Sequence, residues 1–208
     1  MGMTELKLEG VHHISCITAD ATANVEFYAG VMGMRLVKKT VNQDDPSVYH
    51  LFFGDEKGGP GFDLTFFEYP GARKGRAGAG MVHRILWRVG SGEALDYWEK
   101  RLADNSIGTE RTPDGLLFAD PEGLHHELLV YGGTDERLVP GHIEVPPEFA
   151  LQGFHGARAY SASPQVTAQV LEEIMGFTPS EPGEWVLEGD QRSGVYYLDP
   201  PPEERGIP

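Results

Sequence analysis

The sequence contains one cysteine, Cys16, which excludes an intrachain disulfide. No apolar run approaches the roughly 18 residues of a membrane-spanning helix, and Met1 to Leu8 lacks a signal-like apolar segment. Basic residues are also scarce, since 17 Lys and Arg face 32 Asp and Glu, for a net charge of −15. This balance disfavours binding to nucleic acid or to anionic membranes. We therefore expect a cytoplasmic protein whose partners are small molecules.

What the sequence does contain is apolar residues and turn formers. Hydrophobic residues make up 40% of the 208 positions, which is enough to build a substantial core. The 27 glycines and 15 prolines predict many tight turns between short strands. Cys16 lies within an apolar alternation, which is typical of a packed thiol and not of a nucleophile.

Two adjacent histidines, His12 and His13, occur in a short β-type run that begins at Gly10. Alternation along a strand would place His13 and Ser15 on one face and His12 and Ile14 on the other. One histidine should then face a cavity while the other packs beneath a helix. The pair fits two readings: partly buried polar residues at the start of a strand, or a functional pair, although it lacks metal-ligand spacing by itself.

The His12 motif recurs along the chain. His83 and His155 stand in similar settings, at separations of 71 and 72 residues. Gly33 and Gly176 are 143 residues apart, as are His12 and His155. Two landmarks thus keep the same offset, which indicates an internal repeat.

Each repeat continues from its opening strand into a helical pattern. In the first, Asp20 is expected to cap a helix that ends at Gly33, and in the third Ser163 and Pro164 are expected to begin one. The expected buried stripes are Val25, Tyr28 and Met32 in the first helix, Leu95, Trp98 and Leu102 in the second, and Val166, Val170 and Ile174 in the third. The β-type runs that follow these helices are 35–41, 48–53, 62–68, 115–118, 124–131, 184–187 and 195–198.

These patterns predict an α+β fold made of βαβββ modules that pair into half-barrel sheets. Three modules are expected, at residues 8–72, 79–133 and 150–200. One helix covers only one face of a four-stranded sheet, so each module needs a partner. A fourth module is missing from this scheme, because its opening strand would fall past Pro208. A partner chain or a longer protein is expected to supply it.

The ordered motifs resemble those of the vicinal oxygen chelate superfamily, which includes glyoxalase I, bleomycin-resistance proteins and extradiol dioxygenases. More narrowly they resemble the hydroquinone-type ring-cleaving dioxygenases. The residues that carry this resemblance are His12-His13-Ile14, residues 27–33 and 35–42, Asp44-Asp45-Pro46, Tyr49-His50-Leu51, and residues 118–127.

The resemblance implies four modules and a metal held by a histidine of the first module and by a histidine and a glutamate of the fourth. Carried over, His13 is a metal ligand and His12 is its catalytic neighbour, which orients the ligand strand or moves a proton. The implied metal is Fe(II), with Mn(II) as the alternative, and the implied reactants are dioxygen and a hydroquinone or catechol-like aromatic. This chain alone would then lack two ligands. The alternatives are a metal-dependent isomerase or lyase of the glyoxalase kind, and a non-catalytic small-molecule-binding protein of the bleomycin-resistance kind.

The register of the repeat separates the other histidines from the metal. The position of His13 is occupied by Arg84 in the second module and by Gly156 in the third. His83 and His155 are therefore expected on the helix-facing side, and Glu127 is expected to be structural or solvent-facing. Tyr49 and His50 are further candidates for the pocket. Because a sheet and its repeat are left unpaired, we also expect a homo-oligomer.

Overall fold

The computed structural model describes residues 7–207. Residues 1–6 and Pro208 lie outside the described residues. The expectations about the N-terminal segment and about continuation past Pro208 depend on them. The chain begins with β1 (His13–Thr18), α1 (Ala21–Val25), the π-helical η1 (Glu26–Val31), β2 (Arg35–Val41), β3 (Tyr49–Gly54) and β4 (Asp63–Glu68). These strands form a four-stranded sheet in the order β1-β4-β3-β2, in which β1 and β4 are parallel.

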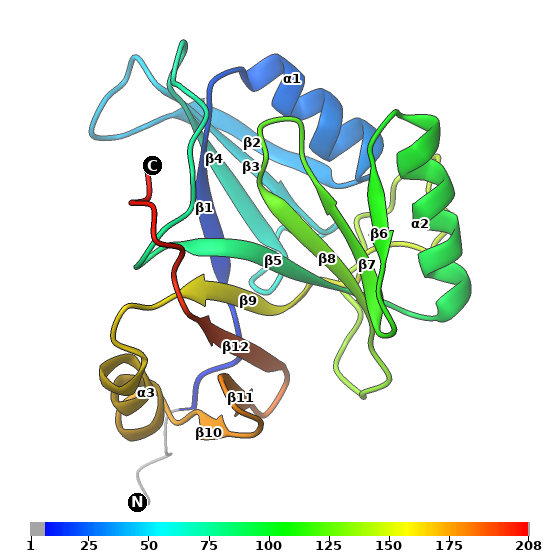
Figure 1. Ribbon diagram of the computed structural model, residues 1–208. Coiled ribbons are helices and arrows are strands. Elements are labelled where there is room, and N and C mark those ends of the chain that lie inside the picture. The colour runs from blue at the N-terminus through cyan, green and yellow to red at the C-terminus, as the bar shows by residue number, and fades with distance from the viewer. Residues whose placement is uncertain (1–6, 208) are drawn as a thin grey trace, which may run out of the picture.

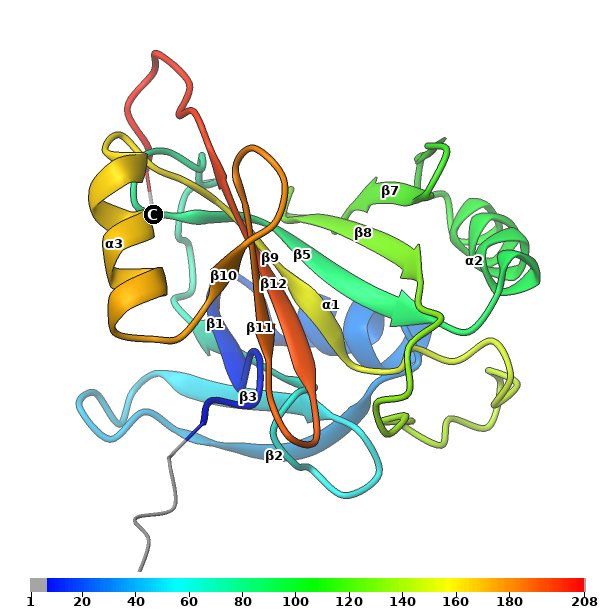
Figure 2. The same ribbon diagram turned by 90° about the horizontal axis from the view of Figure 1, so that it is seen from below.

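The rest of the chain forms an eight-stranded sheet in the order β10-β11-β12-β9-β5-β8-β7-β6. Its first half comprises β5 (Val82–Val89), α2 (Gly92–Asp104), β6 (Thr109–Arg111), β7 (Gly115–Ala119) and β8 (His125–Val130). Its second half comprises β9 (Phe154–Tyr160), α3 (Pro164–Glu173), β10 (Thr178–Pro179), β11 (Glu184–Glu188) and β12 (Ser193–Asp199). The halves join through the antiparallel pair β5 and β9, and α2 and α3 lie toward opposite ends of the sheet (Figure 1 and Figure 2).

The predicted α+β class with mixed sheets is confirmed, and each predicted β-type run falls on a strand. The sequence patterns missed two strands, β6 and β10, of three and two residues. Such short edge strands carry too few alternating residues to give a period. Among the described residues, none of the helices is long and apolar enough to cross a membrane.

The first two helices follow their sequence signals. The Asp20 side chain accepts hydrogen bonds from the N–H groups of Thr22 and Ala23 at the start of α1. In α2 the predicted residues Leu95, Trp98 and Leu102 are buried. The π-helical turn was not predicted. Its last carbonyls, those of residues 30 and 31, accept hydrogen bonds from the Arg101 guanidinium at 2.7 and 2.8 Å.

The predicted buried stripe of the third helix is wrong. Val166, Val170 and Ile174 are 63%, 43% and 77% exposed, and Leu171 is the buried residue of α3. Spacing by three and four shows that residues share a face, but not that the face meets the core. Here the helix turns Leu171 toward the sheet and leaves the valines outside.

A buried hydrogen-bonded chain joins the first sheet and its helix to the eight-stranded sheet. Tyr28 of η1 packs its ring against Phe66 of β4, with ring centroids 4.7 Å apart. Its hydroxyl donates to Asp120 Oδ2 at 2.8 Å and lies 3.1 Å from His126 Nε2. The indole N–H of Trp87 donates to His126 Nδ1 at 3.0 Å. Four polar side chains from distant parts of the sequence thereby satisfy one another inside the core.

This pattern of donors and acceptors assigns the protonation state of His126. Because Nδ1 accepts from Trp87, the ring proton of the neutral imidazole is on Nε2, where it donates to the Tyr28 oxygen. Burial lowers the pKa of His126 to about 3, with a smaller contribution from His125. His126 is therefore neutral in the folded protein at any pH near 7.

We predict that Tyr28→Phe lowers the free energy of unfolding by about 1–3 kcal/mol, because it leaves Asp120 and His126 with buried, unpaired polar atoms. Urea unfolding measures the change. Tyr97→Phe is the matched control, since the Tyr97 hydroxyl donates to the Glu144 carbonyl in an exposed setting, and its cost should be about 1 kcal/mol or less. Equal costs for the two variants would contradict the role given to the buried chain.

Buried His126 should also make the fold sensitive to acid. The unfolded chain takes up a proton at this residue below about pH 6.5, whereas the folded chain does so only near its lowered pKa of about 3. Stability should therefore fall by about 1.4 kcal/mol per pH unit for this residue as the pH drops below 6.5. Urea unfolding between pH 7.5 and 5 measures the slope, which His126→Gln should reduce by one proton. An NMR titration that found His126 protonating near pH 6.5 would refute the assignment.

Candidate active site on the first sheet

One face of the first sheet carries the predicted ligand. Along β1, Ile14 and Cys16 pack toward the core, whereas His13 and Ser15 are exposed on the other side. In register with them on β4 are Asp63 and Thr65, and Thr65 donates to the Ser15 hydroxyl at 3.0 Å. Strand alternation thus presents a polar row led by His13 on the side away from the core.

His12 and His13 do not separate onto opposite faces as predicted. Their Nδ1 atoms lie 3.2 Å apart, and their rings meet edge to face with centroids 5.2 Å apart. The strand begins at His13, so His12 lies before it. The alternation of side chains between the two faces of the strand therefore does not set the direction of the His12 side chain. The two imidazoles form a dyad in which one Nδ1 donates to the other.

Aromatic rings lie on the same face as His13. His50 on β3 stacks on Phe67, with centroids 3.9 Å apart, and lies 4.0 Å from the Phe52 ring. Its Nε2 is buried and has no hydrogen-bond partner among the described residues. The face therefore offers flat aromatic surface on the same side of the sheet as His13. Tyr49 alternates with His50 and so lies on the other side of the strand, where Lys39 sits 3.9 Å from its ring centroid.

The charged groups of this face influence one another. Burial raises the pKa of Asp63, and the nearby His13, His12 and His50 partly oppose that rise. Burial likewise lowers the pKa of His50, which Asp63 opposes. Sequence analysis missed Asp63, because a single carboxylate at the start of a strand has no motif. Only the pairing of β1 with β4 brings it beside His13.

The residues on this face do not complete a metal centre. Across residues 7–207 there is no group of three or more His, Cys, Asp or Glu side chains that could hold a metal ion. His13 is exposed on a rigid strand and could offer one imidazole nitrogen. The described part of the chain therefore fits one position of the two-histidine, one-carboxylate set that the resemblance implies, and not the whole set.

His83 and His155 are not packed beneath helices, which corrects the expectation from the repeat. His83 stacks on Tyr160 at 3.9 Å and contacts Asp199 through Nε2 at 2.8 Å. Arg158 donates to both oxygens of the same Asp199 carboxylate. Because side chains alternate along β9, Arg158 lies on the face of the sheet opposite to Ala157, and His83 shares the face of Arg158. The pairing of β5 with β9 shifts register on either side of His83 and again at His155. A β-bulge at each histidine changes the direction in which its side chain points.

In the eight-stranded sheet, the position that corresponds to His13 is occupied by Arg84, which forms a salt bridge. Arg84 donates to Glu127 at 3.0 Å, and the side chains are 25% and 13% exposed. The guanidinium provides the positive charge that a metal would provide, so Glu127 is structural, which is one of its two expected roles. Cys16 is likewise structural, since burial raises the pKa of its thiol to about 12.

The fold and this face define an α+β protein with two mixed sheets and a histidine dyad at the exposed edge strand of one of them. Residues 10–128 match the model of the Glyoxalase/Bleomycin resistance protein/Dioxygenase superfamily. The chain belongs to this superfamily.

Individual relatives make the comparison more specific. The chain is 45% identical over 174 residues to Bacillus subtilis (strain 168) MhqO, which is assigned as a ring-cleaving dioxygenase, and this match covers 82% of the chain but 55% of MhqO. It is 32% identical over 199 residues to the chlorohydroquinone/hydroquinone 1,2-dioxygenase of Sphingobium indicum, covering 91% of the chain and 58% of that protein. The chain thus spans little more than half of these relatives.

A solved structure shares the fold over almost the whole chain. It is that of a Bacillus subtilis protein assigned as a dioxygenase, with a TM-score of 0.86 and 40% sequence identity. The superposition covers 96% of this chain and 66% of the other. The arrangement of the two sheets is therefore that of this relative.

Proposed function

We propose that the protein acts as a ring-cleaving dioxygenase on hydroquinone or catechol-like aromatics, with Fe(II) as its metal and Mn(II) as the alternative. The observation that carries this proposal is the exposed His13, paired with His12 and lying on the same face of the first sheet as the rings of His50, Phe52 and Phe67. Relatives named as ring-cleaving dioxygenases, 32% to 45% identical, support it.

In this proposal His13 provides one metal ligand, and the other ligands come from outside residues 7–207. When bound by two imidazoles and a carboxylate, Fe(II) can hold a diol and dioxygen in its remaining positions. The residues of this chain orient and bind. His12 fixes the ring of His13 through the Nδ1 contact of 3.2 Å, and Phe52 and Phe67 offer flat surface to an aromatic ring.

The eight-stranded sheet suggests how the site is completed. We propose that residues 8–72, 79–133 and 150–200 are modules, and that the second and third pair through β5 and β9. In the first sheet the corresponding strand, β1, is at the edge. A further opening strand, from a fourth module or a second copy, would pair with β1 in the same antiparallel way and bring its side chains beside His13. This pairing also supports the expected association of chains.

The first test of this proposal is metal content. In the natural polypeptide that contains this sequence, His13→Ala should reduce bound Fe(II) from about one equivalent to below about a tenth, because one of three protein ligands is lost. His125→Ala is the matched control, since His125 is also an exposed histidine at the start of a strand, and it should leave the iron in place. Metal analysis after desalting measures both. Equal iron in the two variants would remove His13 from the site.

The second test is oxygen consumption. The Fe(II)-loaded polypeptide should consume one dioxygen per hydroquinone or catechol, and chelation of the metal should abolish the uptake. His12→Ala should lower the turnover by more than about tenfold while it keeps most of the iron, because it frees the His13 ring. An oxygen electrode with product mass spectrometry measures the reaction. Metal-dependent conversion of a substrate without oxygen uptake would favour the glyoxalase alternative, and binding of the aromatic by the metal-loaded polypeptide without any conversion would favour the sequestering protein.

A further inference from the structure

A second hollow lies on the other side of His12, between α3 and the chain that leads into β1. Its volume is about 410 Å³, which is within the range of small-molecule pockets. The apolar side chains that line it are Leu8, Val11, Val170, Leu171, Met175, Phe177 and Leu187. Of the three residues predicted to form the buried stripe of α3, Val170 lines the hollow, whereas Val166 and Ile174 do not.

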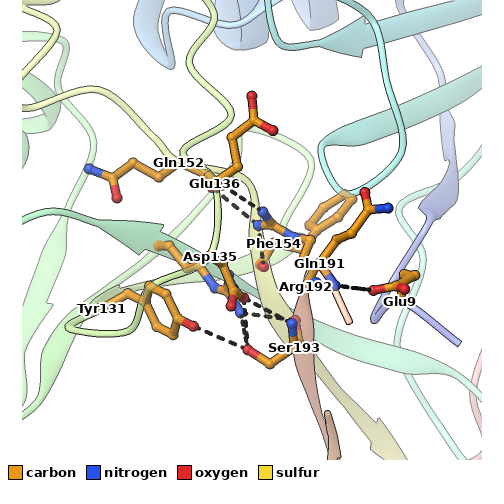
Figure 3. Close-up of polar contacts among 10 residues, drawn as sticks. Glu9, Tyr131, Asp135, Glu136, Gln152, Phe154, Gln191, Arg192 and Ser193 are labelled. Carbon is orange, nitrogen blue, oxygen red and sulfur yellow. Dashed lines mark hydrogen bonds and ion pairs between the residues drawn. The ribbon is translucent and has the colours of Figure 1, made fainter. Parts of the chain in front are cut away.

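One wall of the hollow is the segment that leads into β1, which we call the N-terminal approach, and hydrogen bonds hold it in position. The Glu9 carboxylate accepts hydrogen bonds from the N–H groups of Asp190, Gln191 and Arg192 at 3.2, 2.9 and 3.1 Å. Figure 3 shows Glu9 beside Gln191 and Arg192. Gly10 has φ of +77°, and a side chain there would meet the Ser193 carbonyl at 2.8 Å. The approach therefore crosses the start of β12 in close contact, which only glycine permits.

Buried side chains hold the turn of residues 190–192, whose N–H groups bind Glu9. Arg88, 1% exposed, donates to Asp135 at 2.6 Å and to the Ser193 carbonyl at 2.9 Å. Arg192 donates to the carbonyls of Gln152 and Phe154 at 3.1 and 3.0 Å. These buried contacts tie the turn to β5 and to the start of β9. The hollow is consequently preformed, with one wall on α3 and one on a fixed segment.

Three polar side chains stand in the otherwise apolar lining, and one of them, Thr167, already contacts Ser161 and the Ser163 carbonyl through its hydroxyl. Tyr196 of β12 contributes a hydroxyl that makes no hydrogen bond to any residue between 7 and 207, and burial raises its pKa. His12 contributes its imidazole, of which Nδ1 contacts His13 and Nε2 has no partner in the described part of the chain. A few polar groups within an apolar pocket are what fixes the orientation of a small ligand.

We propose that this hollow binds a small aromatic molecule of one or two rings that carries a phenolic or carbonyl oxygen. The rings lie among the apolar side chains, and the oxygen bonds to Tyr196 or His12. The site is distinct from the aromatic face that carries His13 and needs no metal. His12 belongs to both, because its ring lines the hollow and touches His13.

The test is a fluorescence titration of the metal-free 208-residue chain with 2-naphthol. Binding should saturate at one site, and naphthalene, which lacks the oxygen, should bind several-fold more weakly. Val170→Asp places a charge in the hollow and should weaken 2-naphthol binding at least tenfold. Val166→Asp is the matched control on the same helix, since Val166 is exposed but does not line the hollow, and it should change binding less than twofold.

Tyr196→Phe separates the hydroxyl from the apolar surface, and it should weaken binding of 2-naphthol but not of naphthalene. Methyl NMR of the unmodified chain provides a measurement that needs no variant, because resonances of Val170, Leu171 and Leu187 should shift on addition of 2-naphthol. Unsaturable binding, equal effects of the two valine variants, or shifts confined to other methyl groups would overturn the proposal. Since no metal is present, its failure would leave the dioxygenase proposal standing, and the reverse also holds.

Discussion

The buried chain from Trp87 through His126 and Tyr28 to Asp120 is the constraint on which the arrangement of the two sheets depends. Each polar atom in it is removed from water, so each must find its partner in the chain or leave a costly unpaired group. Tyr28 comes from the helix of the first sheet, and the other three come from the eight-stranded sheet and its turn. The geometry of these bonds therefore fixes how the helix, and the first sheet beneath it, sit against the second sheet.

Once the two sheets are fixed relative to each other, the opening strands β1, β5 and β9 have different neighbours. β5 and β9 pair with each other, and the position that corresponds to His13 is filled by Arg84 in a salt bridge to Glu127. β1 is an edge strand, and His13 is exposed on it beside His12, on the same face as an aromatic surface. The same strand position thus carries a neutralised ion pair in one sheet and an available imidazole in the other, which is why we propose the first sheet as the place of the chemistry.

His12 connects this chemistry to the rest of the molecule. It lies just before β1, so its ring follows the path of the N-terminal approach and not the pleat of the strand. That path is set by Glu9 and Gly10 against the turn before β12. The position of the His12–His13 dyad therefore depends on the second half of the eight-stranded sheet, although both histidines belong to the first sheet by sequence.

The sequence by itself determined the α+β class, the positions of the longer strands, the Asp20 cap and the stripe of α2, because these follow from local alternation, local capping and helical period. It also singled out the histidine pair and carried a family resemblance that the comparisons bear out. Only the tertiary structure decided which face of α3 meets the core, where bulges turn His83 and His155, and that Asp63 lies beside His13. These depend on packing and strand register between residues far apart in the chain, which a local pattern does not encode.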